Sequence, residues 1–209
     1  MPDLAPLSAA VFAGKRDDAK KLTADALAAN APLSDVLAAL ISAMARIGHK
    51  FQCKEAFVPE MLMAARAMKE AMNLLEPGLI KAGITPEHKA LIGTVQGDLH
   101  DIGKNLVAMM WKGANFEVID LGINVPASRF VAAVQKHKPE VVGLSALLTT
   151  TMPAMEETVA AIKTSGVPVR ILVGGAPVTR EFAAKIGADG YAPDATSAVD
   201  LVRSLCVPA

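Results

Sequence analysis

One short loop carries the clearest chemical signal in the sequence. Residues 97–103 read GDLHDIG, which places His100 two residues after Asp98 and directly before Asp101. Neutral imidazole suits a transition metal, and a carboxylate commonly holds its second nitrogen and so fixes the tautomer and the ring orientation. Taken alone, the pattern also fits an ordinary loop histidine and an aspartate that caps a helix.

Two further loops carry groups that can contact a ligand. One runs through residues 145–151, SALLTTT, and supplies hydroxyls, although one of its threonines could instead cap the next helix. The other contains Gly174 and Gly175, where a ligand can approach the backbone closely because no side chain intervenes. A tight turn between a strand and a helix would explain the same two glycines.

The C-terminal half must position these loops, and its pattern is that of alternating strands and helices. Strands are predicted at residues 90–96, 116–121, 140–145, 169–173 and 189–192, and helices at 103–114, 127–137, 151–165, 179–187 and 196–206. Five such strands imply a parallel sheet covered on both faces, a doubly wound, flavodoxin-like α/β domain with strand order 2-1-3-4-5. Ligands bind such sheets at the switch point between the first and third strands, where the three loops should converge.

The N-terminal half has a helical period instead. Leu37, Leu40, Met44 and Ile47 recur at spacings of three and four, and three more segments complete a predicted four-helix bundle. The periodicity stops within residues 76–88, which hold two prolines and two glycines. We therefore expect a helical-bundle cap domain at residues 1–80, a linker at 81–88 and the sheet domain at 89–209.

The composition favours small molecules and proteins as partners. The 209 residues contain 21 Lys plus Arg and 21 Asp plus Glu, so no net charge attracts nucleic acid or an anionic membrane. The predicted protein is soluble and cytoplasmic, since the sequence has neither a spanning apolar run nor a secretory signal. Cys53 and Cys206 have no paired spacing, so neither a disulfide framework nor a zinc site is predicted.

With these motifs in order, the chain resembles the cobalamin-binding module of methionine synthase and, more closely, the free-standing corrinoid proteins of methyltransferase systems. The family pattern Asp-x-His-x-x-Gly, followed by Ser-x-Leu and Gly-Gly, is matched by Asp98, His100, Gly103, Ser145, Leu147, Gly174 and Gly175. The similarity extends into the helical half, where residues 57–60 and the following Ala-Arg-Ala-Met resemble the cap bundle of that family.

The resemblance implies roles for individual residues. His100 is the implied lower ligand of the cobalt, in place of the cofactor's own base (base-off, His-on), and Asp98 holds its second nitrogen. Thr151 stands where methionine synthase has a serine that extends this relay. When the cobalt is Co(I), His100 is expected to dissociate and take up a proton, with Asp98 stabilising the imidazolium.

The resemblance also implies which residues contact cobalamin, either as methylcobalamin or as another corrinoid. Near the lower ligand and the nucleotide tail these are Gly97, Asp98, His100, Asp101, Ile102, Gly103, Ser145, Leu147, Thr149, Gly174 and Gly175. Over the upper face they are Phe51, Val58 and Met61 of the helical half. The catalytic group implied is His100, Asp98 and Thr151, with His100 as the metal ligand.

The implied function is that of a methyl-carrying subunit in one-carbon metabolism. One methyltransferase loads the cobalt, and a second passes the methyl group to tetrahydrofolate or to a thiol such as coenzyme M; a reductive activase is a further possible partner. The donor stays open among methanol, methylamines, glycine betaine and methoxylated aromatics. Two alternatives are the cobalamin-binding subunit of an adenosylcobalamin mutase and a cobalamin sensor without enzymatic activity.

Overall fold

The computed structural model describes residues 3–206, which fall into two compact units. The helical unit extends to Pro86 and includes Gly113–Asn115, and the α/β unit comprises Glu87–Lys112 and the chain from Phe116 onward. No helix within the described residues is both long enough and apolar enough to cross a membrane.

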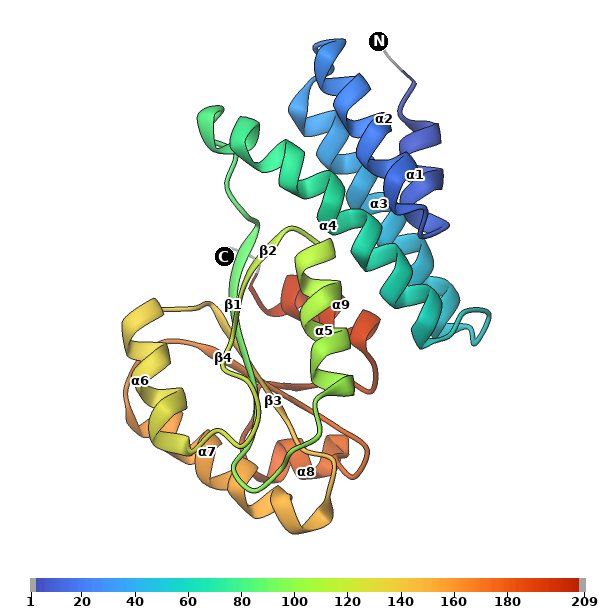
Figure 1. The fold of residues 1–209 in the computed structure, drawn as a ribbon. Coiled ribbons are helices and arrows are strands. Elements are labelled where there is room, and N and C mark those ends of the chain that lie inside the picture. The colour runs from blue at the N-terminus through green and yellow to red at the C-terminus, as the bar shows by residue number, and fades with distance from the viewer. Residues whose placement is uncertain (1–2, 207–209) are drawn as a thin grey trace. The chain divides into compact units, whose positions relative to one another are not determined.

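The helical unit is a bundle of four helices, as predicted. They are α1 (Ala5–Phe12), α2 (Arg16–Ala28), α3 (Leu33–Gln52) and α4 (Val58–Lys81) (Figure 1). In α3, the buried side chains of Val36, Leu40, Met44 and Ile47 recur at spacings of three and four, so one face of the helix packs into the bundle. The most extensive packing in the bundle is between α2 and α4, α1 and α3, and α3 and α4, whereas the consecutive helices α2 and α3 contact each other little.

Helix α4 continues through a proline at which the sequence pattern was expected to stop. Pro77 lies inside the helix, which ends only at Lys81. Leu75 and Leu79, one turn apart, are both buried, and Gly78 is close enough to Leu33 that a Cβ atom there would lie 3.2 Å from its Cδ1. This packing offsets the hydrogen bond that a proline removes from a helix.

The α/β unit has the predicted strand order. The strands are β1 (His88–Thr94), β2 (Phe116–Asp120), β3 (Val141–Ser145), β4 (Arg170–Gly174) and β5 (Gly190–Tyr191), all parallel, in the order β2-β1-β3-β4-β5. Thr94 at the end of β1 is in register with Ser145 at the end of β3. The loops after β1 and β3 therefore leave the sheet side by side.

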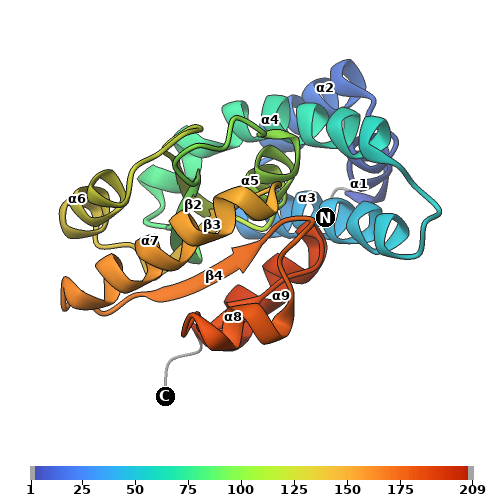
Figure 2. The ribbon, with the colours of Figure 1, turned by 90° about the horizontal axis from the view of Figure 1, so that it is seen from below.

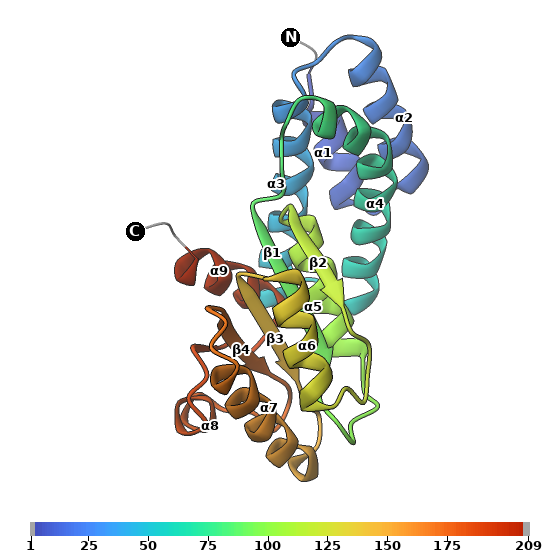
Figure 3. The same ribbon diagram turned by 90° about the vertical axis from the view of Figure 1, so that its left-hand side faces the viewer.

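Helices cover both faces of this sheet. They are α5 (Ile102–Gly113), α6 (Ala127–His137), α7 (Met152–Thr164), α8 (Arg180–Lys185) and α9 (Ala195–Leu205), with a 3-10 turn, η1 (Thr149–Thr151), before α7. Figure 3 shows α6 and α7 side by side across one face, and in Figure 2 strand β4 lies between α7 and α9.

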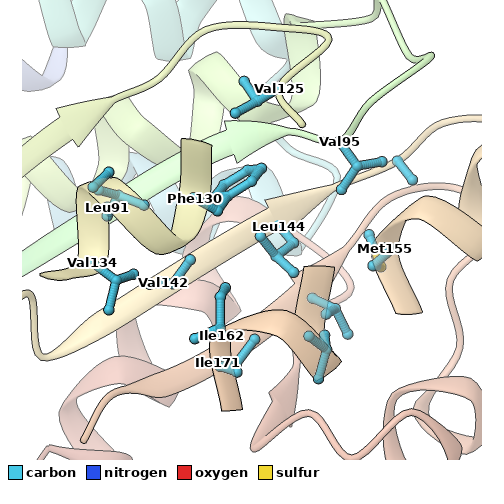
Figure 4. Packing of buried hydrophobic residues seen from close by; sticks show 14 of the residues in the cluster. Leu91, Val95, Val125, Phe130, Val134, Val142, Leu144, Met155, Ile162 and Ile171 are labelled. Carbon is cyan, nitrogen blue, oxygen red and sulfur yellow. The ribbon is translucent and has the colours of Figure 1, made fainter. Parts of the chain in front are cut away.

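Glycines in the central strands let bulky residues of the helices reach the sheet. On one face, Phe130 of α6 is fully buried, and a Cβ atom at Gly93 would lie 2.7 Å from its ring (Figure 4). On the other face, the indole of Trp111 lies against Gly143 and donates a hydrogen bond to the Ala198 carbonyl oxygen at 3.2 Å. This packing fixes the β1–α5 connection at both ends.

Candidate functional site

The loop between β1 and α5 is held by hydrogen bonds to its neighbours. The buried hydroxyl of Thr94 donates to the His100 carbonyl oxygen at 3.0 Å. Gly97 has a φ of +82°, a conformation that favours glycine, and its N–H donates to Asn124 Oδ1 at 2.8 Å. Asn124 N–H in turn donates to the Asp98 carbonyl oxygen at 3.0 Å. The loop after β2 thus fixes the loop that carries His100.

The Asp98 carboxylate is buried and accepts four hydrogen bonds. Its Oδ1 accepts from the backbone N–H of His100 at 3.0 Å and lies 2.8 Å from His100 Nδ1. Its Oδ2 accepts from Leu147 N–H and from the Thr151 hydroxyl, at 2.6 Å and 2.8 Å. Burial opposes ionisation, but these hydrogen bonds outweigh it and hold the pKa of Asp98 well below its usual range. Asp98 therefore remains a carboxylate at neutral pH.

The buried Asp98 carboxylate holds the His100 side chain, which is itself partly exposed to solvent. The His100 side chain is 49% exposed, whereas that of Asp98 is fully buried. Because Nδ1 faces Asp98, the ring places its donor nitrogen there and leaves Nε2 as the nitrogen with a lone pair. Among the described residues, Nε2 has no hydrogen-bond partner, so it can bind a metal.

Thr151 takes part in the same network, although the sequence left open that it caps a helix. Its hydroxyl lies 2.8 Å from Asp98 Oδ2 and 2.9 Å from the Leu148 carbonyl oxygen. Thr151 precedes α7, but its side chain makes no capping hydrogen bond. Asp98 is likewise not a helix cap, since its carboxylate bonds within its own loop and to the loop after β3. The β3 loop thus contributes Leu147 and Thr151 to the Asp98 network.

The other predicted residues of the α/β unit lie around this network. Asp101 accepts a hydrogen bond from Asn105 Nδ2 at 2.9 Å, which gives it a structural role at the start of α5. Ser145 is half-buried at the end of β3, and Thr149 is exposed in η1. Gly174 ends β4, where a Cβ atom would lie 3.2 Å from the Ala192 carbonyl oxygen.

The three residues predicted to cover the upper corrin face belong to the helical unit. Phe51 and Val58 are half-buried, and Met61 is buried. Their role stays a prediction.

Gly103 and Gly175 differ in what a side chain would meet. Gly175 has a φ of +130°, and a Cβ atom there would overlap the Ala146 carbonyl oxygen. Gly103, at the start of α5, has nothing within 4 Å of the Cβ position. Gly175 is therefore required by the fold, whereas Gly103 leaves space open beside His100.

These two glycines give a matched pair of variants. We expect Gly175→Ala to lower the free energy of unfolding by at least about 1–3 kcal/mol, because of backbone strain. Gly103→Ala should fold at least as stably as the wild type, since alanine favours a helix, but should weaken corrinoid binding by about tenfold because the added methyl group fills the space. Thermal denaturation and corrinoid titration separate the two effects, and unchanged corrinoid affinity in Gly103→Ala would show that this space is not used.

Lys104, directly after Gly103, forms a buried ion pair at the start of α5. The residue is 3% exposed, and its Nζ donates to Asp120 Oδ2 at 2.6 Å and to Asn105 Oδ1 at 2.7 Å. Asp120 also accepts from Gly122 N–H at 2.8 Å, so the ion pair links the start of α5 to the end of β2. The ammonium group can be buried because a carboxylate oxygen and an amide oxygen both accept hydrogen bonds from it.

Replacement of Lys104 by methionine should therefore destabilise the α/β unit. The carboxylate of Asp120, whose side chain is 34% exposed, loses its cation, and we expect a loss of about 1–3 kcal/mol in the free energy of unfolding. Lys112→Met, at an exposed position of the same helix, should change it by less than about 0.5 kcal/mol. Equal urea midpoints for the two variants would contradict this role of the buried pair.

The loops that meet at the His100 network carry exposed apolar side chains, and these were only partly predicted. The sequence pointed to Ile102 and Leu147, which are 72% and 43% exposed. Leu99, Ile123 and Leu148 are also large, apolar and exposed, and they were missed. Asn124 was missed too, because nothing in its local sequence indicates a bond to Gly97. The signal that could have indicated Leu99, Ile123 and Leu148 was the presence of large apolar residues in loops.

The site suits a large, mostly apolar cofactor with a central metal. A half-exposed imidazole can supply one nitrogen ligand, a buried carboxylate fixes its orientation, the adjoining loops carry exposed apolar side chains, and Gly103 has open space at its Cβ position. Its position at the carboxyl ends of β1 and β3 is where doubly wound sheets bind ligands. Fold and site together are those of a cofactor-binding protein of the doubly wound class.

Comparison with known proteins identifies the cofactor class. Residues 88–200 match the B12 binding domain family, and residues 4–76 match a second family with the same description. The chain is 37% identical over 205 residues to a corrinoid protein of Desulfitobacterium hafniense strain Y51, with 95% of each chain covered. It is 39% identical over 194 residues to trimethylamine corrinoid protein 1 of Methanosarcina acetivorans, which covers 90% of this chain and 89% of that one.

A solved structure agrees with these relatives. The methanol:cobalamin methyltransferase complex of Methanosarcina barkeri contains a chain that superposes with a TM-score of 0.84 at 30% identity, over 97% of this chain and 79% of that one. The protein described here belongs to the B12-binding corrinoid proteins of methyltransferase systems. The predicted family and fold class are thus confirmed.

Proposed function

We propose that this protein carries a methyl group between two methyltransferases, with His100 as the lower ligand of a corrinoid cobalt. The observation that carries the proposal is the pairing of His100 Nδ1 with Asp98 at 2.8 Å, which leaves Nε2 exposed at the switch point. The corrinoid supplies a cobalt centre that accepts a methyl group and gives it up again. The residues of the chain bind, orient and tune that centre.

Asp98 and Thr151 control the ligand in this proposal. A carboxylate on the second nitrogen raises the basicity of a metal-bound imidazole and fixes its tautomer. Were His100 released from the metal, its ring would stay on Asp98, and the buried carboxylate would stabilise a proton taken up at Nε2. The hydroxyl of Thr151 and the N–H of Leu147 keep Asp98 in place in both situations.

The surrounding residues are assigned to the rest of the cofactor. Leu99, Ile102 and Leu148 are proposed to offer apolar contacts to the corrin ring, because they are exposed on the two loops that the Asp98 network joins. Ser145 and Thr149 are proposed to bond the displaced base. Leu147 lines its path, and Gly103 and the turn at Gly174 give the nucleotide tail room.

The helical unit is proposed to shield the upper face of the cofactor until a partner enzyme arrives. Phe51, Val58 and Met61 are the apolar residues assigned to that cover. The chain between α4 and β1, residues 82–87, is the proposed hinge. Shielding by apolar residues fits a carrier whose reactive group must not meet water between two enzymes.

We propose methylamines as donors, because the relatives include proteins named for trimethylamine and dimethylamine. The acceptor enzyme passes the methyl group to tetrahydrofolate or a thiol, and a reductive activase restores the carrier after oxidation. The test is to load the protein with corrinoid, add purified methylamine or methanol methyltransferases with their substrates, and follow methylation in the visible spectrum. Methylation by a methylamine enzyme supports the proposal, whereas no methylation with any of them, together with selective binding of adenosylcobalamin, would favour a mutase subunit.

A further inference from the structure

A second group of potential metal ligands lies at the amino ends of the strands, at the opposite end of the sheet from His100. His88 is the first residue of β1, Glu140 directly precedes β3, and Cys206 directly follows α9. One ligand atom from each lies within 4.8 Å of the others. The seven residues of β1 separate this end of the sheet from the loop that carries His100, so the strand alone places the two sites roughly 20 Å apart along its axis.

The His88 side chain is fixed in this group. It is 10% exposed, its Nδ1 lies 2.8 Å from Glu140 Oε2, and its ring packs edge-on against Phe116 with centroids 5.1 Å apart. Glu140 is held in turn, since its Oε1 accepts from Lys89 N–H at 3.2 Å. The imidazole and the carboxylate are therefore oriented before any ion arrives.

Nearby cations are engaged with other carboxylates. Arg203 forms two hydrogen bonds with Glu87, at 3.1 Å and 3.0 Å, and Arg170 lies 3.5 Å from Asp189. Glu87 Oε1 also lies 3.7 Å from His88 Nε2, so two carboxylates face this imidazole. The charge around His88 and Cys206 therefore accommodates a divalent cation.

We propose that His88, Glu140 and Cys206 bind one divalent ion of the zinc class, apart from the corrinoid site. Sulfur, imidazole nitrogen and carboxylate oxygen are the three donor types that zinc takes in proteins, at about 2.0–2.3 Å. In a tetrahedral site such donors lie roughly 3.5 Å apart. The most distant ligand atoms therefore need to close by about 1.3 Å at most, and His88 Nδ1 and Glu140 Oε2, now 2.8 Å apart, need to separate by less than about 1 Å. The ion takes the place of the proton between His88 Nδ1 and Glu140, and that proton moves to His88 Nε2, which faces Glu87. The Cys206 thiol gives its proton to solvent, and water is the fourth ligand.

The proposed ion links the end of α9 to the starts of β1 and β3. Binding to the folded state alone raises stability by mass action. Zinc should therefore raise the thermal midpoint of the protein, and this effect should depend on Cys206. A purely structural His88–Glu140 pair would give no such dependence.

The test uses full-length, corrinoid-loaded protein, so that His100 is already occupied, and titrates zinc chloride by calorimetry. We expect one ion per chain in the wild type and at least about tenfold weaker binding in Cys206→Ser and His88→Gln. Cys53→Ser is the matched control, because Cys53 is exposed and lies 3.8 Å from His49, where an ion could bind adventitiously. It should bind zinc as the wild type does.

A second measurement checks the thiol directly. Cadmium bound to a thiolate gives an ultraviolet charge-transfer band, which should appear in the wild type and in Cys53→Ser and be lost in Cys206→Ser. Absence of stoichiometric zinc binding, or binding unchanged in Cys206→Ser, would overturn the proposed site. Neither result bears on His100, so the carrier proposal is tested separately.

Discussion

Replacement of His100 by alanine is expected to abolish methyl transfer by this protein. The imidazole is the exposed end of the network, and its removal takes away the ring nitrogen that we propose as the cobalt ligand. Loss of a partner that only orients a metal ligand typically costs 10–100-fold in affinity or activity. Loss of the ligand itself should therefore lower the rate of methyl transfer by more than about 100-fold.

The structure separates this effect from unfolding. His100→Ala removes one of the four hydrogen bonds to Asp98 and keeps the His100 N–H on the same oxygen, so it should lower the free energy of unfolding by no more than about 1.5–3 kcal/mol, as Thr151→Val should, and still fold. His49→Ala is the matched control, because this exposed histidine lies on α3 in the helical unit. If His100→Ala transfers methyl groups at the wild-type rate while it binds corrinoid, the assignment of the lower ligand fails.

Replacement of Asp98 should affect both stability and chemistry. Asp98→Asn keeps the size of the side chain but turns an NH2 group toward donors, so at least one of the four hydrogen bonds becomes a donor–donor contact. Breaking a buried charged network in this way costs about 3–5 kcal/mol. Thr151→Val removes a single donor and should cost about 1.5–3 kcal/mol.

The contribution of the Asp98 carboxylate to stability should decrease as the pH falls. The pKa of Asp98 is lower in the folded protein than in the unfolded chain, so its contribution to stability is fully present above about pH 4. The contribution is lost progressively as the pH falls below that value toward the folded-state pKa. In urea unfolding of corrinoid-free protein, the difference in the free energy of unfolding between the wild type and Asp98→Asn should therefore become smaller as the pH falls below about 4. A constant difference would show that the hydrogen bonds do not stabilise the charged form.

Much of the fold could be predicted because the two halves have different periods. The predicted order of five parallel strands followed from the alternation of apolar runs with helical segments, and the β3–α7 loop was correctly expected to meet the His100 loop. Pro77 was misleading, since local propensity points to a break while burial of Leu79 and the close approach of Gly78 to Leu33 keep the helix intact. Packing of residues 75–79 therefore keeps α4 helical through Pro77, against the local preference of proline.

The site residues that belong to a local sequence motif could be predicted, whereas those that reach the site from distant parts of the chain could not. Asp98, His100 and Thr151 were identified from the sequence, and the structure brings them together. Asn124 comes from the β2–α6 loop and Lys104 pairs with a residue 16 positions away, so neither has a local signature. Cys206 was read as an isolated cysteine, because its approach to His88 exists only in the folded sheet.

The most direct test of the account is the electron paramagnetic resonance spectrum of the Co(II) form, made from uniformly 15N-labelled protein and unlabelled corrinoid. Coupling of the unpaired electron to the axial nitrogen splits each cobalt line according to the spin of that nitrogen. If His100 is the lower ligand, labelling the protein should convert triplets into doublets, and His100→Ala should lose the doublets. Triplets that persist in the labelled protein would mean that the base of the cofactor itself binds the cobalt, in contradiction to the role assigned to His100.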